Sequence, residues 1–455
     1  MTSYIIEPDR AGVAGEVGAP GDKSIGHRAA ILAALASGEV SITGMGRGED
    51  NRRSLGAAEA LGAEISARGC AGGGEALRVH GVGLDGLAAP RGPIDCGNAG
   101  TAMRLLAGIL AGQNFGSELV GDASLSRRPM RRIGDPLTAM GASVTGREGQ
   151  RPGEIYPPLS VRGPRRGRLA GLDWTLDVAS AQVKSAILLA GLFAEGAVSV
   201  SEPGPTRDHT ERMLAYLGAP VSRDKGRVTL DPAGWDRRLE PRPLAVPGDP
   251  SAAAFAVAAG LVAGGGDIAV RGVCVNDTRT GFFDALATMG ARIERRNERH
   301  EGGEPVADLH VPASAGEGLR GAEIGGDVVV RAIDEIPILA VVAARAAGDT
   351  DFRDAEELRY KESDRIATTT EMLRGFGVEV EEHAGGFRVR GRGAKPLAPA
   401  RVDAAGDHRI AMSAAVAALA ADGPTRVDDV DNVATSFPEF PAALGSLGAQ
   451  IRTVD

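Results

Sequence analysis

The stretch "LGAEI" at residues 61–65 decides the fold, because the chain repeats its pattern five more times. Each copy has a large apolar residue, a glycine, a small residue in most cases, and then a segment of β character. The glycines lie 79, 77, 72, 87 and 71 residues apart, at Gly62, Gly141, Gly218, Gly290, Gly377 and Gly448. Glycine in this place is typical of the residue that ends a helix before a strand. The pattern therefore predicts six copies of one helix–strand unit.

A second repeat divides the chain into halves. "PGDKS" at 20–24 is matched by "PGDPS" at 247–251, an offset of 227 residues. Alternating helices and strands favour an α/β fold. We predict two domains of three units each, the first formed by residues 1–20 plus 246–455 and the second by residues 21–245. The crossovers between them are expected near 20–22 and 245–249.

Length, charge and cysteine content narrow the class of protein. A chain of 455 residues is too long for a single core, and its net charge of −9 argues against nucleic acid as a partner. The odd number of cysteines, at Cys70, Cys96 and Cys274, shows no metal-binding pattern and favours a reducing compartment. With no leader sequence or membrane span in evidence, we expect a cytoplasmic monomer that binds neither a membrane nor a metal.

The helix starts carry candidate anion-binding residues. "PGDKSIGHR" at 20–28 is not a P-loop, because Asp22 separates Gly21 from Lys23. Helix N-termini bind anions, however, and four of the six starts add basic side chains: Lys23 and Arg28, Arg104, Lys184, and His408 with Arg409. The start at 248 has Pro250 in the place of Lys23, so we interpret it as a purely structural turn. The alternative is that Ser24 and Ser180 are only helix N-caps.

Two further basic pairs and a few carboxylates complete the pattern. Arg128 and Arg132 are four residues apart, as are Lys361 and Arg365, so each pair shares one face if it is helical. Asp334 and Glu335 open an apolar helix, where a carboxylate serves either as a cap or as a general base. Many cations and few carboxylates predict a multiply anionic small substrate and phosphate chemistry with proton transfers.

Nine motifs in sequence order now point to a family. They are "PGDKSIGHR", "GNAGTAMR", "SAQVK", "TRDHTE", "NDTR", "IDEIPILA", "LRYKESDR", "GDHRIAM" and "TSFPEF". The chain resembles the 5-enolpyruvylshikimate-3-phosphate (EPSP) synthase family, in its class II-like subgroup. The resemblance implies two domains of three βαβαββ units with the active site in the interdomain cleft. It implies transfer of enolpyruvate from phosphoenolpyruvate to 3-phosphoshikimate, through a tetrahedral intermediate and without a cofactor.

The resemblance also implies residue roles. Catalysis falls to Asp334, which accepts the proton of the attacking hydroxyl, to Glu362 and to Lys23. The implied 3-phosphoshikimate contacts are Lys23, Ser24, Arg28, Ser180, Ala181, Gln182, Arg207, Asp334 and Lys361. The implied phosphoenolpyruvate contacts are Lys23, Asn98, Gly100, Arg128, Gln182, Arg365 and Arg409. Glyphosate is the competitor that the family implies for the second set.

The sequence departs from the family at a few positions and leaves rivals open. Thr435 stands where many relatives have lysine, and Leu105 where many have proline. One rival is the transferase that acts on UDP-N-acetylglucosamine, whose usual loop cysteine is absent from "GDASLSRRPM" at 121–130. Another is a non-catalytic anion-binding relative, against which the presence of Asp334 and Glu362 argues. RNA 3′-phosphate cyclase has a similar fold, but the acidic charge balance disfavours it.

Overall fold

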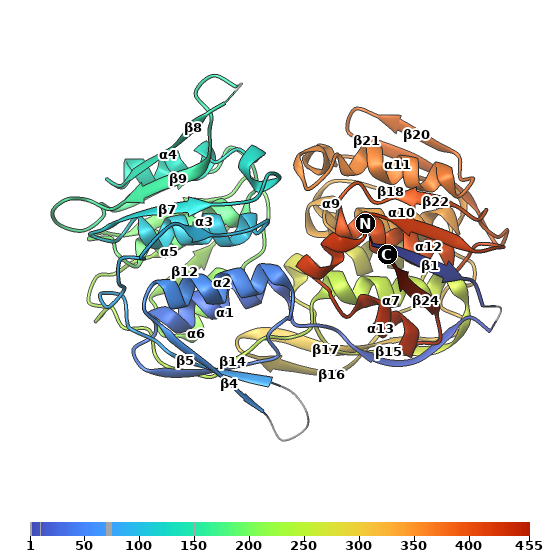
Figure 1. Ribbon diagram of the computed structural model, residues 1–455, viewed down its shortest axis with the longest axis horizontal. Coiled ribbons are helices and arrows are strands. Elements are labelled where there is room, and N and C mark those ends of the chain that lie inside the picture. Colours follow the sequence, from blue (N-terminus) through green and yellow to red (C-terminus); the bar gives the residue numbers. More distant parts are fainter. Residues whose placement is uncertain (1, 10, 70–74, 150) are drawn as a thin grey trace. The chain divides into compact units, whose positions relative to one another are not determined.

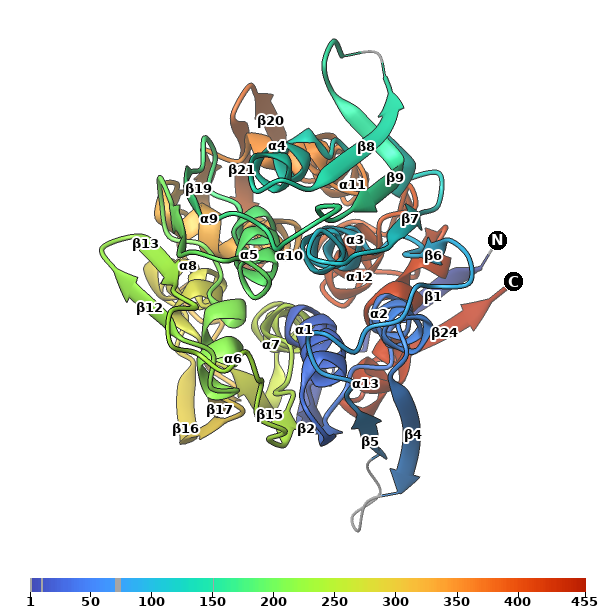
Figure 2. The ribbon, with the colours of Figure 1, turned by 90° about the vertical axis from the view of Figure 1, so that its left-hand side faces the viewer.

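The computed structural model describes residues 2–9, 11–69, 75–149 and 151–455, so Cys70 lies outside the described residues. The chain forms two compact units (Figures 1 and 2). Unit 1 comprises Met1–Pro20, Pro247–His300 and Pro305–Asp455, and unit 2 comprises Gly21–Val246 with Glu301–Glu304.

Each unit contains three four-stranded sheets, and all six sheets have one topology. In each sheet one edge strand pairs in parallel with its neighbour, and that neighbour pairs antiparallel with the next strand. Three sheets and their helices follow a βαβαββ pattern along a continuous stretch of chain, whereas the other three each include one strand from a distant part of the chain, Ser3–Glu7, Val13–Gly18 or Leu244–Ala245. The six predicted repeats and the α/β fold class are confirmed.

Unit 2 consists of sheets and helices that follow each other along the chain. The sheets are, in spatial order, β14 (Leu244–Ala245), β3 (Glu39–Thr43), β5 (Glu75–His80) and β4 (Glu64–Gly69); β6 (Ile94–Asp95), β7 (Gly116–Val120), β9 (Ile155–Arg162) and β8 (Ser143–Glu148); and β10 (Leu172–Thr175), β11 (Val198–Ser201), β13 (Arg227–Leu230) and β12 (Val221–Asp224). The helices are α1 (Lys23–Leu35), α2 (Glu49–Ala60), α3 (Gly100–Leu110), α4 (Arg131–Ala139), α5 (Ala181–Gly191) and α6 (His209–Tyr216).

Unit 1 repeats this arrangement. Its sheets are β16 (Glu294–Glu301), β17 (Glu304–Val311), β15 (Gly265–Cys274) and β2 (Val13–Gly18); β18 (Glu323–Ile324), β19 (Ala347–Phe352), β21 (Gly386–Arg392) and β20 (Val380–His383); and β22 (Arg401–Asp403), β23 (Thr425–Asp428), β1 (Ser3–Glu7) and β24 (Gln450–Val454). Its helices are α7 (Pro250–Ala263), α8 (Gly281–Thr288), α9 (Asp327–Ala332), α10 (Ile336–Ala344), α11 (Arg365–Gly375), α12 (His408–Ala418) and α13 (Phe440–Ser446).

Helix α10 is apolar all round, which is why it lies inside. All nine residues of α10, "IPILAVVAA", are buried, and α10 packs against α7 and α12. A helix that is hydrophobic on every face is stable only when surrounded by protein. Most candidate site residues lie at or near the first turns of helices α1, α3, α5, α10, α11 and α12.

The six repeat glycines occupy the predicted place. Each follows the capping residue of its helix and has a positive φ, between 73° at Gly377 and 105° at Gly62. Side chains with a Cβ rarely adopt this left-handed conformation, so glycine is required there.

At each of the two crossovers the chain leaves an edge strand of one unit and enters a helix of the other. Strand β2 pairs with β15 of unit 1 but leads into α1 of unit 2. Strand β14 pairs with β3 of unit 2 but leads into α7 of unit 1. The "PGD" turns at 20–22 and 247–249 are therefore equivalent places in two repeats.

Candidate active site

The start of α1 sets the first group of polar side chains in unit 2. Asp22, not Ser24, is the N-cap, because its Oδ1 accepts from the Ile25 amide over 2.8 Å. Lys23 follows as the first helical residue, and its Nζ lies 3.0 Å from Asp50 Oδ2 with 20% of the side chain exposed. Ser24 Oγ accepts from Arg207 Nη1 over 3.5 Å. The cap is thus supplied by the residue that breaks the P-loop pattern, and Ser24 is left for other contacts.

Arg28 lies one turn further along α1 and is bonded to protein. Its Nε donates to Thr210 Oγ1 over 2.7 Å, its Nη1 to the Ser24 carbonyl over 2.8 Å and its Nη2 to Ser185 Oγ over 2.9 Å. Burial lowers the pKa of Arg28 to about 10. Its direct contact with substrate stays a prediction, whereas its support of Ser24 is visible in the structure.

A second group surrounds the start of α3. Gly100 is the first residue of the helix, and a Cβ placed there would lie 3.0 Å from Arg128 Nη1. Arg128 Nη2 donates to Asn98 Oδ1 over 2.8 Å. Arg128 caps the short 3₁₀ helix Leu125–Arg127 in extended backbone, and α4 begins only at Arg131. Arg128 and Arg132 were expected to share a face if the segment is helical, and this condition is not met.

The start of α5 lies against α3. Ser180 is the N-cap, with its Oγ accepting from the Val183 amide over 3.4 Å, and Ala181 is the first helical residue. Gln182 donates from Nε2 to Thr101 Oγ1 over 2.9 Å, and its Oε1 accepts from Arg104. Gln182 thus joins the starts of α3 and α5, which a single sequence could not indicate.

Lys184 does not belong to an anion-binding group. Its side chain is fully buried, and its Nζ lies 2.8 Å from Glu202 Oε1 and 2.7 Å from Glu211 Oε1. Two carboxylates already balance this cation, so counting Lys184 among the anion-binding helix starts was wrong. Its partners come from β11–α6 sequence that carries no local signal of the pairing.

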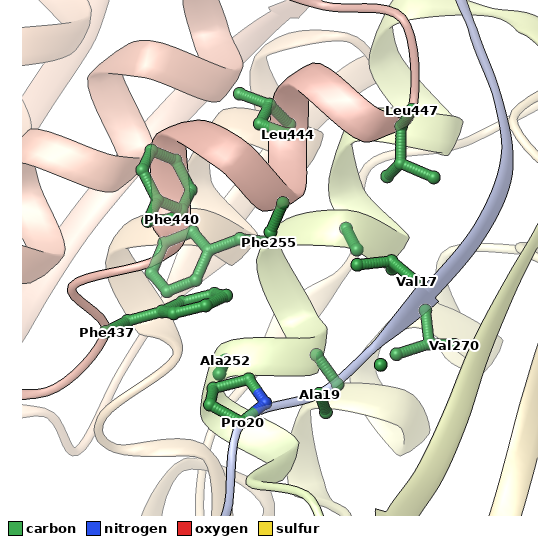
Figure 3. A pocket seen from close by; sticks show the side chains of 14 residues that line it. Val17, Ala19, Pro20, Ala252, Phe255, Val270, Phe437, Phe440, Leu444 and Leu447 are labelled. Atoms are coloured by element: carbon green, nitrogen blue, oxygen red, sulfur yellow. The ribbon is translucent and has the colours of Figure 1, made fainter. Parts of the chain in front are cut away.

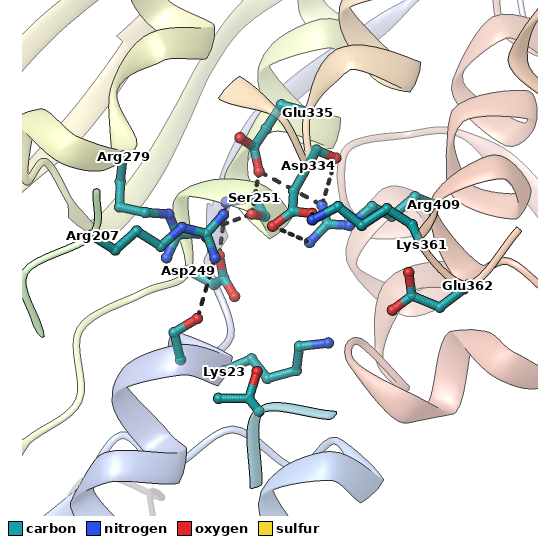
Figure 4. Close-up of polar contacts among 12 residues, drawn as sticks. Lys23, Arg207, Asp249, Ser251, Arg279, Asp334, Glu335, Lys361, Glu362 and Arg409 are labelled. Carbon is teal, nitrogen blue, oxygen red and sulfur yellow. Dashed lines mark hydrogen bonds and ion pairs between the residues drawn. The ribbon is translucent and has the colours of Figure 1, made fainter. Parts of the chain in front are cut away.

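In unit 1 a cage of cations surrounds Asp334, which lies between α9 and α10 (Figure 4). Arg365 Nη1 lies 3.3 Å from Asp334 Oδ1, and Lys361 Nζ lies 3.6 Å from the same oxygen. Arg409, the second residue of α12, donates from Nη1 to the Asp334 carbonyl over 3.0 Å. The structure brings these predicted residues together from three helix starts.

Arg365 is the most enclosed of these cations. Its Nε donates to Asp407 Oδ2 over 2.8 Å and its Nη2 to Glu362 Oε2 over 2.6 Å. Burial opposes the charge, but the Asp407 and Glu362 carboxylates outweigh it and hold the pKa of Arg365 above its usual value. Lys361 ends a 3₁₀ helix in extended backbone and Arg365 opens α11, so this pair does not share a helix face either.

The sequence reasoning missed two residues that hold the candidate site residues in place. Asp407 caps α12 and pairs with Arg365, and Asp50 pairs with Lys23. Glu335, which the sequence analysis did name, pairs with Arg409. Asp407 stands inside the quoted motif "GDHRIAM", so an N-cap reading of that motif could have found it.

The two departures from the family pattern receive local explanations. Thr435 Oγ1 donates to the Asn432 carbonyl over 2.7 Å, which closes its own 3₁₀ turn. Leu105 is completely buried in α3 and therefore acts on any ligand only through packing. Cys96 is buried as well, and burial raises the pKa of its thiol to about 12. A thiol so rarely ionised is a poor nucleophile, which further disfavours a cysteine-dependent transferase.

Other features of the described chain do not suit a cofactor. Asp208, His209 and Glu304 lie close enough to share a metal ion, but Asp208 accepts from Arg212 and Arg223, and His209 Nδ1 lies 2.7 Å from Glu304 Oε1. An apolar pocket in unit 1 is lined by Val17, Pro20, Phe255, Phe437 and Phe440 among others (Figure 3). Its apolar walls do not suit a polyanionic substrate. Across the described ranges, every helix is too short or too polar to cross a membrane.

Comparison with solved structures shows which class of proteins has this fold. A structure of the enolpyruvyl transferase NikO from Streptomyces tendae covers 100% of this chain and 99% of its own, with a TM-score of 0.75 and 20% identity. That likeness shows the fold alone. A structure of EPSP synthase from Acinetobacter baumannii has a TM-score of 0.86 and 40% identity, with both chains fully covered.

Sequence relatives then give the family. The profile of EPSP synthase, 3-phosphoshikimate 1-carboxyvinyltransferase, matches residues 9–444. The 3-phosphoshikimate 1-carboxyvinyltransferase of Geobacter metallireducens is 47% identical over 99% of this chain and 100% of the relative. That of Acidithiobacillus ferrooxidans is 49% identical over 98% of both chains. The chain belongs to the EPSP synthase family and is a transferase of aromatic amino acid biosynthesis.

Proposed function

We propose that this chain transfers enolpyruvate from phosphoenolpyruvate to the 5-hydroxyl of 3-phosphoshikimate with its own residues in the roles that follow. The observation that carries the proposal is the cage around Asp334, where Arg365, Lys361 and Arg409 all approach within 4.0 Å. A carboxylate among cations can accept a proton while its neighbours hold anionic substrates.

The 3-phosphoshikimate is held by side chains at helix starts of both units. The proposed contacts of unit 2 are Lys23, Ser24, Arg28, Ser180, Ala181, Gln182 and Arg207, and those of unit 1 are Asp334 and Lys361. Phosphoenolpyruvate is held by Lys23, Asn98, Gly100, Arg128 and Gln182 of unit 2 and by Arg365 and Arg409 of unit 1. The two substrates together carry roughly five negative charges, which only many cations and helix ends can offset.

The chemistry proceeds by addition and elimination. Asp334 takes the proton of the 5-hydroxyl while the hydroxyl oxygen bonds to C2 of phosphoenolpyruvate. A proton is added to the methylene carbon. The bond between C2 and the phosphate oxygen then breaks while the new methyl group returns one proton, so the C=C bond re-forms and the product enol ether results. The hydroxyl proton leaves with the phosphate. Glu362 serves the proton transfers at this carbon, and its bond to Arg365 orients it. Lys23 stabilises the charge of both ligands.

We also propose that units 1 and 2 are the enzyme's two domains, with crossovers near 20–22 and 245–249. Strands β2 and β14, after which the chain passes from one unit to the other, support these limits. We further expect a cytoplasmic monomer, and the free, buried Cys96 supports a reducing compartment.

A phosphate-release assay tests the function. Phosphoenolpyruvate is supplied with 3-phosphoshikimate, with shikimate, or with UDP-N-acetylglucosamine. We expect rapid phosphate release only with 3-phosphoshikimate. Release with UDP-N-acetylglucosamine would identify the sister transferase, and none with any acceptor would favour the non-catalytic relative.

A further inference from the structure

Two motifs without a proposed role in the reaction lie together in unit 1. They are the turn "GDPS" at 248–251, which carries Pro250 in place of a lysine, and the motif "NDTR" at 276–279. Arg279 Nη2 donates to Ser251 Oγ over 2.9 Å and to Asp249 Oδ1 over 3.0 Å (Figure 4). The Arg279 side chain is only 1% exposed, so these contacts are shielded from water.

The direction of the hydrogen bonds follows from the chemistry of the groups. Arginine can only donate, so Ser251 Oγ is an acceptor toward Arg279. The single proton of the Ser251 hydroxyl is then available for Glu335 Oε1, with which Ser251 is hydrogen-bonded. Asp249 fixes the other side of Ser251 by accepting from its backbone amide over 2.8 Å. The orientation of Ser251 is thus determined by Arg279 and Asp249.

Glu335 connects Ser251 to Arg409. Its Oε1, the atom that Ser251 contacts, lies 3.6 Å from Arg409 Nη1. The same Nη1 donates to the Asp334 carbonyl over 3.0 Å. Glu335 and Arg409 are 2% and 8% exposed, so this charge attraction is only weakly screened by water.

We propose that Asp249, Arg279, Ser251 and Glu335 form a positioning chain that fixes the Arg409 guanidinium and so sets the affinity for phosphoenolpyruvate. The inference rests on the proposed function, which assigns Arg409 to that substrate. An arginine side chain has many rotamers, and holding it in place before binding avoids the entropy cost of ordering it on the ligand. The turn at 248–251 thereby contributes to the site through hydrogen bonds and one ion pair, whereas the equivalent turn at 21–24 contributes a lysine.

The test compares Glu335→Gln, Ser251→Ala and wild type in steady-state kinetics. Glu335→Gln keeps the shape and removes the charge that faces Arg409. We expect the KM for phosphoenolpyruvate to rise on the order of tenfold. The KM for 3-phosphoshikimate and kcat should change by less than about twofold. Ser251→Ala should shift the same constant by a smaller factor. Glu317→Gln makes the same chemical change at an exposed position of unit 1 and should match wild type.

A double-mutant cycle with Arg409→Lys tests the positioning chain separately from the proposed function. If Glu335 acts through Arg409, the combined effect on the KM for phosphoenolpyruvate is smaller than the product of the single effects. If the effects of the two substitutions simply multiply, the positioning chain is overturned and the proposed function stands. The same conclusion follows if Glu335→Gln raises both KM values in parallel and lowers the thermal midpoint. If Arg409→Lys itself leaves phosphoenolpyruvate kinetics unchanged, the assignment of Arg409 fails and the positioning chain fails with it. Should Glu335→Gln not fold, Ser251→Ala with Arg409→Lys completes the same cycle.

Discussion

Arg365 donates from Nε to Asp407 Oδ2 over 2.8 Å, and the two side chains are 1% and 0% exposed. Asp407 is also the N-cap of α12, since it accepts from the Arg409 amide over 2.9 Å. The Asp407 carboxylate therefore holds two proposed phosphoenolpyruvate contacts. It pairs with the charged guanidinium of Arg365, and it accepts from the backbone amide of Arg409.

Asp407→Asn should destabilise the fold by about 3–5 kcal/mol, because it removes one partner of a buried ion pair. Burial would raise the pKa of Asp407, but Arg365 outweighs it and keeps that pKa below the ordinary value of 3.8. The lowered pKa means that the stabilisation is present above pH 3.8 and is lost as the pH falls through the folded-state value. Urea unfolding between pH 3 and 7 should show the wild-type advantage shrinking at the acid end. An advantage independent of pH would contradict the ion-pair account.

Lys23→Ala and Lys184→Ala should have opposite effects, although both lysines stand near helix starts. Lys23 is partly exposed, so its loss should cost less than about 1 kcal/mol of stability. Each charge-assisted contact to the ligands is worth roughly 1.5–3 kcal/mol, so activity should be abolished. Lys184→Ala leaves Glu202 and Glu211 buried without their cation and should unfold the chain or lower its thermal midpoint strongly. Thermal melts and phosphate-release rates of both variants test these roles. A folded, active Lys184→Ala enzyme would refute the structural role of Lys184.

Gly100→Ala should weaken glyphosate inhibition more than phosphoenolpyruvate binding. The new Cβ would lie 3.0 Å from Arg128 Nη1 and 3.2 Å from Arg104 Nη1, so both guanidinium groups must shift. Adding a methyl group to a filled site costs about 1–3 kcal/mol, and the longer ligand should bear most of it. Inhibition curves at fixed phosphoenolpyruvate should show a loss of tenfold or more relative to wild type. Equal inhibition constants would mean that Gly100 does not line this ligand's site.

The sequence predicted the repeat architecture well because the signal is local and periodic. Each repeat glycine adopts the left-handed backbone that its place after a helix requires, and this needs no knowledge of distant partners. The helices that begin at Lys23, Gly100, Ala181 and His408 were predicted for the same reason, since each contains a segment rich in alanine and other apolar residues.

The partners of individual side chains could not be predicted in the same way. Lys184 resembles Lys23 in its local sequence, but its carboxylates lie 18 and 27 residues further along the chain. The four-residue spacing of Lys361 and Arg365 suggested a helix face, whereas Asp364 caps α11 between them. Tertiary contacts decide which cations remain for substrate, and a single sequence does not contain them.

The most direct test of the account is the kinetics of Asp334→Asn. Asparagine keeps the size of aspartate but cannot accept the hydroxyl proton, and loss of a general base typically costs a factor of ~10²–10⁴. The account predicts that kcat falls by about this factor while 3-phosphoshikimate, measured by calorimetry, binds with little change. A variant that retains kcat but no longer binds 3-phosphoshikimate would show that Asp334 is a binding residue and would contradict the catalytic role proposed for the cage around it.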